Sequence, residues 1–194
     1  MRKDIRELLR KLEKKNRKEK EANLPTEERM RSIPPETGLF LHLLVKISRA
    51  KNILEIGSSQ GYSTIWLASA CEEIGAKMTS LEINERSAAK AQRNLRQVKL
   101  DGLVRIKIGD AKEILPNLKG RFDFIFIDAE KKDYLTYFNL IQPILENNGL
   151  MVADNIISHA EILSDYKKVV EKNPDFQNII IPIGSGEMLS YKAK

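Results

Sequence analysis

Short apolar runs alternate with amphipathic stretches along most of this chain. Runs rich in branched residues and bounded by turn residues predict strands, while apolar positions three or four apart predict helices. The predicted strands are 52–56, 77–83, 104–109, 122–127, 150–154, 176–183 and 187–192. The predicted helices are 62–73, 84–98, 111–118, 134–146 and 161–172, preceded by helices that start at 25–28 and 34–37. We expect an α/β fold with a doubly wound, mostly parallel sheet and an antiparallel terminal hairpin.

Composition limits the class of protein. The 194 residues are 42% hydrophobic and 31% charged, as in an ordinary globular protein, and no apolar run reaches the roughly 18 residues of a membrane helix. The N-terminus also lacks the apolar segment of a signal peptide, so we expect a cytoplasmic protein with no membrane partner. The lone Cys71, with His42 and His159, cannot make a zinc cluster. Any metal would therefore be a hard cation held by oxygen atoms.

The net charge of +6 is concentrated at the N-terminus. Residues 1–20 hold ten of the 33 Lys and Arg residues and four of the 27 acids, so the rest of the chain is formally neutral. We divide the chain into a basic N-terminal helical arm with further helices, 1–34, and an α/β domain, 35–194. The arm could contact a polyanion such as transfer RNA. We favour a solvated helix, because acids are interspersed and Ile5, Leu8 and Leu12 lie on one apolar stripe.

The turn after the first predicted strand, within ILEIGSSQGYSTIWLA, suits a nucleotide-like cofactor. Gly57 and Gly61 allow close approach of a ligand to the backbone, and the following helix offers free N–H groups. Ser59 stands between them, so the turn is not the G-x-G-x-x-G dinucleotide fingerprint. Glu82 ends the next strand, where a carboxylate can accept both ribose hydroxyls. Gly109-Asp110-Ala111 ends the third strand, where the base of the nucleoside would reach.

Two later strands end in acids, in FDFIFIDAEKKDY and LMVADN. If the strands are neighbours, Asp128, Asp154 and Asn155 meet, and the unpaired carboxylates would raise each other's pKa. A divalent cation removes that conflict, and these oxygens with water and substrate suit the octahedron of Mg²⁺. The alternative is that the acids cap helices or pair with Lys131 and Lys132.

Taken in order, these segments resemble the S-adenosylmethionine-dependent O-methyltransferases of the catechol and caffeoyl-coenzyme A type. The resemblance rests on E-x-G-x-x-x-G-Y-S, then LE, GDA, F-D-x-x-F-I-D-A-x-K and ADN, and it extends from about Ser32 to Tyr191. It implies a Rossmann-like class I methyltransferase fold with seven strands. It also implies that Lys131, in the position of the family's catalytic lysine, takes the proton of the substrate hydroxyl. The metal would be Mg²⁺, or alternatively Mn²⁺ or Ca²⁺, at Asp128, Asp154 and Asn155.

The resemblance also implies a cofactor site, in which residues 55–63 wrap the methionine part and Glu82 holds the ribose. The residues that we expect to hold S-adenosylmethionine are Glu55, Gly57, Ser59, Gly61, Tyr62, Ser63, Glu82, Gly109, Asp110, Ala111 and Asp128. We expect a homodimer and a small hydroxylated, aromatic substrate. Relatives often have G-D-G where this chain has Gly184-Ser185-Gly186, and no acid precedes that turn in NIIIPI, which argues against catechol specificity.

Two alternative functions remain open. The first keeps the chemistry but takes RNA, as in a branch of these enzymes that methylates 5-hydroxyuridine in transfer RNA, and the basic arm motivates it. The second is a protein that binds S-adenosylmethionine without catalysis, or a nicotinamide oxidoreductase. The presence of Asp128, Lys131, Asp154 and Asn155 argues against a non-catalytic protein, and the missing G-x-G-x-x-G argues against the oxidoreductase.

Overall fold

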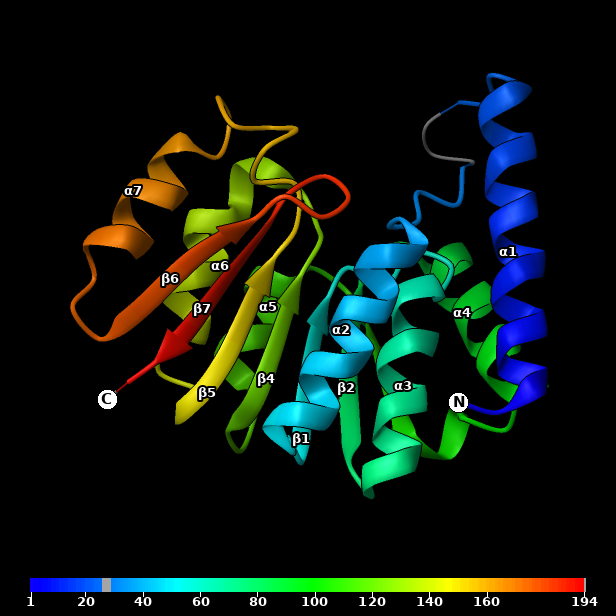
Figure 1. Cartoon of the computed structure of the whole chain (residues 1–194), viewed down its shortest axis with the longest axis horizontal. Helices are drawn as coiled ribbons and strands as arrows, with labels where there is room; N and C mark the ends of the chain where they lie inside the picture. The colour runs from blue at the N-terminus through cyan, green and yellow to red at the C-terminus, as the bar shows by residue number, and fades with distance from the viewer. Residues whose placement is uncertain (26–28, 194) are drawn as a thin grey trace.

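The computed structural model of the chain describes residues 1–25 and 29–193, which form a sheet between two layers of helices (Figure 1). The helices are α1 Lys3–Glu21, α2 Pro35–Ser48, α3 Tyr62–Ile74, α4 Glu85–Gln97, α5 Ala111–Ile114, α6 Tyr134–Ile141 and α7 Ser164–Lys172. The strands are β1 Asn52–Ile56, β2 Lys77–Glu82, β3 Val104–Ile108, β4 Phe122–Ile127, β5 Leu145–Ala153, β6 Phe176–Ile181 and β7 Glu187–Lys192.

The sheet has the order β3-β2-β1-β4-β5-β7-β6. The first five strands pair in parallel, and β7 pairs antiparallel with both β5 and β6. The expected doubly wound sheet with an antiparallel hairpin is therefore confirmed. The strand order reverses between β1 and β4, so the loops at their carboxyl ends diverge and leave room for a ligand.

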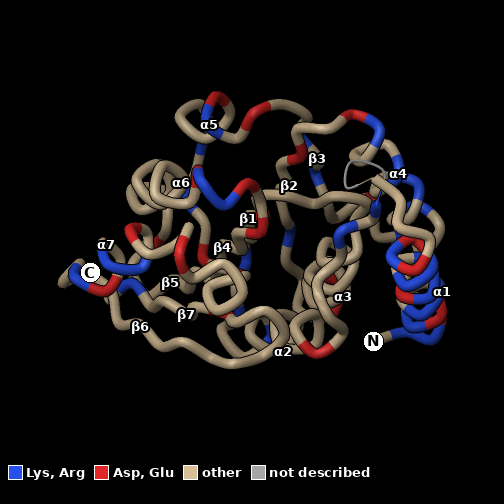
Figure 2. The backbone as a smooth tube through the Cα atoms, turned by 90° about the horizontal axis from the view of Figure 1, so that it is seen from above, with Lys and Arg blue, Asp and Glu red and all other residues tan. Residues whose placement is uncertain are grey.

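Two hydrophobic clusters cover the two faces of the sheet. One joins apolar residues of α1, α2, α3 and α4, and the other joins those of α6 and α7 with Ala111 of α5. Seen from above, α2 and α3 lie on one side of the central strands and α5 and α6 on the other (Figure 2). Alternate strand residues therefore face opposite layers, which fixes the direction of every polar side chain in the sheet.

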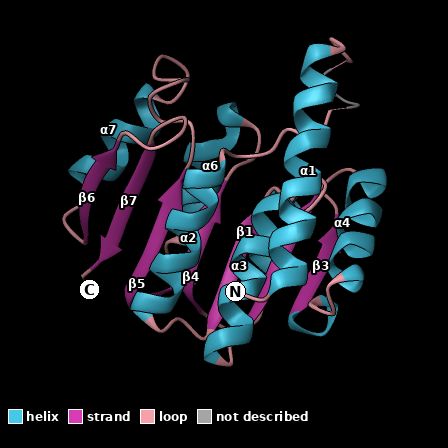
Figure 3. Cartoon of the chain, turned by 45° about the vertical axis from the view of Figure 1, so that its right-hand side comes forward, coloured by secondary structure: helices cyan, strands magenta, loops and turns pink. Residues whose placement is uncertain are grey.

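The basic N-terminal segment forms one long helix, α1, beside α3 (Figure 3). Its stripe of Ile5, Leu8, Leu9 and Leu12 is buried in the same cluster as the core of the sheet. The N-terminal amine also lies 2.6 Å from Glu73 of α3. Most of the other charged side chains of α1 remain exposed. Within residues 1–25 and 29–193, no helix has both the length and the apolar character to cross a membrane.

Two predicted helix boundaries differ from the structure, and a third cannot be compared with it. The helix predicted over 134–146 ends at Ile141, because the chain turns at Pro143 and Leu145 already pairs with Phe122 as the start of β5. The helix predicted from 161 starts at Ser164, after a series of turns. The predicted helix start at 25–28 lies largely outside the described residues. The helix predicted from 84 starts at Glu85, and Asn84 caps it by accepting a hydrogen bond from the Ser87 N–H at 2.9 Å.

Candidate functional site

A cavity of about 920 Å³ opens at the carboxyl ends of the central strands. It collects the loops that follow β1 to β5, together with the segment 29–34 that precedes α2. The site residues expected from the sequence that line it are Gly57, Ser59, Tyr62, Ser63, Glu82, Gly109, Asp110, Ala111, Asp128, Lys131, Asp154 and Asn155. The other two expected site residues, Glu55 and Gly61, are described in the structure but do not line this cavity.

The turn after β1 brings its backbone close to the other loops. Gly57 has a φ of +96°, and a Cβ at this position would collide with the Asp128 carbonyl. Gly61 has a φ of +89°, and a Cβ there would lie 2.9 Å from the Cβ of Ala91 in α4. Both positions therefore need glycine for conformation and for space. Between them Ser59 also has a left-handed backbone, with a φ of 47°.

Glu82 links the ends of β1 and β2. Its Oε2 accepts a hydrogen bond from the Ser59 N–H at 2.6 Å, and its Oε1 accepts one from the Asn84 N–H at 2.8 Å. Burial raises the pKa of this carboxyl, although both backbone donors oppose that change. The backbone thus holds the carboxylate at the cavity wall, with lone pairs left for a ligand. Asp110 plays a comparable part in the loop after β3, where it caps α5 through the Lys112 N–H at 2.8 Å.

Glu55 turns away from the cavity into the core. It is fully buried beneath the glycine turn, and it accepts hydrogen bonds from the hydroxyls of Ser63, Thr64 and Ser80, each at 2.6 Å. Burial raises the pKa of Glu55 to about 7 in spite of these donors. Glu55 therefore ties the start of α3 to β2 beneath the turn, and the cofactor contact that the resemblance implies for it stays a prediction.

The acids at the ends of β4 and β5 come together with a lysine. The Nζ of Lys131 lies 2.9 Å from Asp128 Oδ1 and 3.1 Å from the carbonyl of Ala129. Asp154 is 2% exposed, and its Oδ1 accepts a hydrogen bond from the Asn155 N–H at 2.6 Å. Burial and the charge of Asp128 raise the pKa of Asp154. The carboxylates of Asp128 and Asp154 thus lie beside the nearly buried ammonium group of Lys131.

Glu187, at the start of β7, is an acid that we did not single out from the sequence. It is fully buried, and burial followed by the charge of Asp154 raises the pKa of this carboxyl to about 10. It directly follows the Gly184-Ser185-Gly186 turn, whereas the expected position of such an acid was the segment NIIIPI before that turn. The pairing of Ala153 with Met188 brings it near Asp154. The proximity of Glu187 to Asp154 therefore follows from the register of β5 with β7.

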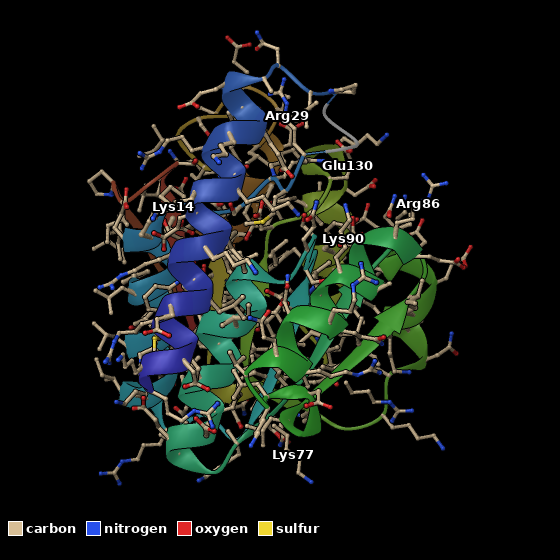
Figure 4. All side chains as sticks on the ribbon, turned by 90° about the vertical axis from the view of Figure 1, so that its right-hand side faces the viewer. Lys14, Arg29, Lys77, Arg86, Lys90 and Glu130 are labelled. Atoms are coloured by element: carbon tan, nitrogen blue, oxygen red, sulfur yellow. The ribbon has the colours of Figure 1, made fainter. Side chains whose placement is uncertain are left out.

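Other lining residues also went unnoticed in the sequence. The segment 29–34 contributes Arg29 and Arg31 to the rim, and Arg29 and Glu130 are labelled in Figure 4. His159 and Ser185 face the same cavity from the loop after β5 and from the terminal hairpin. Arg29, Arg31 and His159 belong to no motif of the sequence, and Ser185 lies in the Gly184-Ser185-Gly186 turn, whose place in the cavity follows only from long-range contacts.

Known proteins resemble this chain in sequence and in fold. A family model described as O-methyltransferase matches residues 3–191. A catechol O-methyltransferase of Niastella koreensis is 42% identical over 138 residues, which cover 69% of this chain and 62% of that protein. One of Mycobacterium tuberculosis is 33% identical over 135 residues, covering 69% and 61%. The matches thus span less than two thirds of the length of these two relatives.

The fold matches solved structures over nearly its whole length. An O-methyltransferase from Bacillus cereus, solved in complex with SAH, superposes with a TM-score of 0.82 at 28% identity, and the match covers 96% of this chain and 90% of that one. The family model, the two relatives and this structure agree with each other, and the chain belongs to the O-methyltransferase family.

Proposed function

We propose that this protein is a metal-dependent O-methyltransferase that moves the methyl group of S-adenosylmethionine to a hydroxyl of a small, hydroxylated aromatic molecule. The observation that supports it best is the convergence of Asp128, Lys131, Asp154 and Asn155 in a cavity that also contains the glycine turn and Glu82. The names of the relatives and the SAH in the Bacillus cereus structure agree with this chemistry.

The cofactor would lie along the wall formed by the loops after β1, β2 and β3. The turn from Gly57 to Ser63 would hold the methionine part, because its glycines keep the backbone open. Glu82 would accept hydrogen bonds from the ribose, since its carboxylate is already fixed by two backbone donors. Asp110 and Ala111 would border the base.

The donor set fits a hard divalent cation. Among the described residues, no three His, Cys, Asp or Glu side chains form a metal centre. The protein ligands would therefore be the carboxylates of Asp128 and Asp154 and the amide oxygen of Asn155, with water and substrate in the other positions. When bound, such a cation lowers the pKa of the substrate hydroxyl and orients it. Burial and then the charge of Asp128 raise the pKa of Asp154, and a bound cation would offset the repulsion between the two carboxylates.

Lys131 would take the proton. The hydroxyl oxygen would attack the methyl carbon as the carbon–sulfur bond breaks, giving a methyl ether and S-adenosylhomocysteine. The proton would move to Nζ of Lys131, which for this step must carry a lone pair, as the neutral amine. This nitrogen is held between Asp128 and the Ala129 carbonyl, and its side chain is 10% exposed. Lys132, which is exposed, is the natural control for this role.

A methyl-transfer screen with labelled S-adenosylmethionine tests the proposal. The acceptors are catechols and other hydroxylated aromatics, each with magnesium and with chelator. We expect turnover that chelator abolishes and magnesium restores, that Lys131→Met removes, and that Lys132→Met retains. Full turnover in chelator would refute the metal assignment, and full turnover by Lys131→Met would refute the base.

A second candidate uses the same site with RNA as the methyl acceptor, and the charge distribution on α1 favours it. Glu13 and Glu19 turn inward to Tyr62 and Met30, whereas Lys14 and Lys18 stay exposed beside a hollow of about 870 Å³ on that helix (Lys14 is labelled in Figure 4). Two of the interspersed acids therefore face inward, whereas Glu7 and Glu21 line the hollow together with the cations.

Gel shifts with transfer RNA over a salt series test this candidate, using the wild type and a Lys14/Arg17/Lys18→Gln variant. If α1 binds phosphates, the variant should bind less tightly and with a smaller salt slope, by about one unit for each lost contact. RNA affinity that responds neither to the variant nor to salt would exclude it.

We also propose a homodimer formed through the outer face of α2. Leu39, Leu43 and Ile47 follow each other at one-turn spacing and are 48%, 45% and 76% exposed. An apolar stripe of this kind is typical of a contact surface. Light scattering of the wild type and of Leu43→Glu tests it, since the charge should shift a dimer toward monomer.

A further inference from the structure

The N-terminal helix holds the turn that follows β1 by two side-chain contacts. The Nζ of Lys15 donates a hydrogen bond to Oε1 of Gln60 at 2.7 Å, and the hydroxyl of Tyr62 donates one to Oε1 of Glu13 at 2.8 Å. Gln60 and Tyr62 are adjacent to Gly61, and each is 2% exposed. A helix that the charge pattern presents as a solvated arm thus contacts two side chains of the turn in the proposed cofactor site.

A second connection runs through the segment that leads to α2. Oε2 of Glu19 accepts a hydrogen bond from the Met30 N–H at 2.7 Å, and the Met30 carbonyl accepts one from the Ser59 hydroxyl at 3.0 Å. Lys15 Nζ also lies 3.6 Å from Glu19 Oε1, so the two connections share one ion pair. Met30 and Ser59 both line the cavity.

The turn has a conformation that needs support from outside. Gly57, Ser59 and Gly61 have φ angles of +96°, 47° and +89°, so left-handed residues alternate along it. The two glycines adopt this region without strain, but the left-handed backbone of Ser59 is costly and persists only where its surroundings determine it. The Asn94 side chain contributes from α4, donating to the Gln60 carbonyl at 2.9 Å. The contacts of α1 complete this support on the other side.

We propose that Glu13 and Lys15 are positioning residues of the cofactor site, which hold the turn of residues 57–62 in its ligand-binding conformation before the cofactor arrives. The identity of the cofactor rests on the function proposed above. A turn that is already ordered loses less conformational entropy on binding, so these residues increase affinity without touching the ligand.

Calorimetric titration with S-adenosylhomocysteine tests this role without requiring turnover. We expect Lys15→Met and Glu13→Ala each to weaken binding about tenfold, which corresponds to one charge-assisted hydrogen bond. The conservative Glu13→Gln, which keeps an oxygen acceptor for Tyr62, should restore binding. With an acceptor found in the screen, KM for S-adenosylmethionine should rise while kcat at saturation stays unchanged.

Lys11→Met is the matched control for Lys15→Met, because Lys11 is exposed one turn earlier on α1 and makes no ion pair among the described residues. It should bind as the wild type does. Wild-type affinity in both Lys15→Met and Glu13→Ala would overturn the inference, and so would equal losses in Glu13→Gln and Glu13→Ala. Failure of the wild type itself to bind would instead overturn the proposed function.

Discussion

The buried carboxyl of Glu55 should make the stability of the protein fall as the pH rises. It is fully buried under the glycine turn and takes three hydroxyl donors, from Ser63, Thr64 and Ser80. Glu55→Gln is the matching change, because glutamine has the shape of the protonated acid and cannot ionise. The hydroxyls can rotate to accept from its amide group, so the packing should survive.

The size of the effect follows from the pKa. Burial raises the pKa of Glu55 from 4.5 to about 7, so between these values the folded protein keeps a proton that the unfolded chain has lost. Stability therefore decreases with rising pH across this window, because the unfolded state binds fewer protons. At 1.36 kcal/mol for each pKa unit, the free energy of unfolding should fall by roughly 3 kcal/mol from below pH 4.5 to above pH 7. The contribution is fully present at the acid end.

Urea unfolding followed by circular dichroism at several pH values from 4.5 to 8 measures it. Other buried acids titrate too, so the informative quantity is the difference between wild type and variant at each pH. That difference should change by roughly 3 kcal/mol in favour of Glu55→Gln as the pH rises. Glu85→Gln, at the exposed start of α4, should keep the wild-type dependence. Parallel curves for wild type and Glu55→Gln would refute a raised pKa at this site.

Three further predictions address the site. Glu82→Ala should weaken binding of S-adenosylhomocysteine in calorimetry by about tenfold or more, through loss of charge-assisted hydrogen bonds, and unchanged affinity would remove Glu82 from the site. Asp154→Ala should abolish methyl transfer in the labelled assay and still bind the same ligand, whereas retained turnover would separate Asp154 from the chemistry. Gly57→Ala should lose both stability and ligand binding, because the new Cβ would collide with the Asp128 carbonyl. The control Gly75→Ala has open space around it, so it should lower the free energy of unfolding by only about 1–2 kcal/mol, for its left-handed backbone. Equal melting temperatures of the two variants would contradict this.

The strands and their terminal acids could be predicted from sequence because both depend on local patterns. An apolar run that stops on Asp128 or Asp154 already gives the strand and its end, and parallel pairing brings such ends to one edge of the sheet. The direction of Glu55 depends on the structure, because apolar residues stand on both faces of its strand. Ile53 and Leu54 pack in different clusters, and alternation then places Glu55 with Ile53 on the α3 face. The cofactor contact that the resemblance implies for Glu55 stays a prediction.

Long-range pairing explains what the sequence did not reveal. Glu187 meets Asp154 only through the register of β5 with β7, and no local pattern encodes that register. The end of α6 was missed for a different reason, since residues 142–146 have a helical spacing of apolar positions that Pro143 and the pairing of Leu145 override.

The two faces of α1 make deletion of the arm an ambiguous experiment. Its inner face supplies Glu13 and Lys15 to the glycine turn, while its outer face keeps the exposed cations that motivate RNA binding. Removing residues 1–20 would also expose the apolar residues of α3 that Leu8 and Leu12 cover. A truncated protein that failed to methylate RNA would therefore not show that RNA binds α1. Point variants on one face leave the other intact, so they separate a phosphate contact, which depends on salt, from cofactor positioning, which appears in the affinity for S-adenosylhomocysteine.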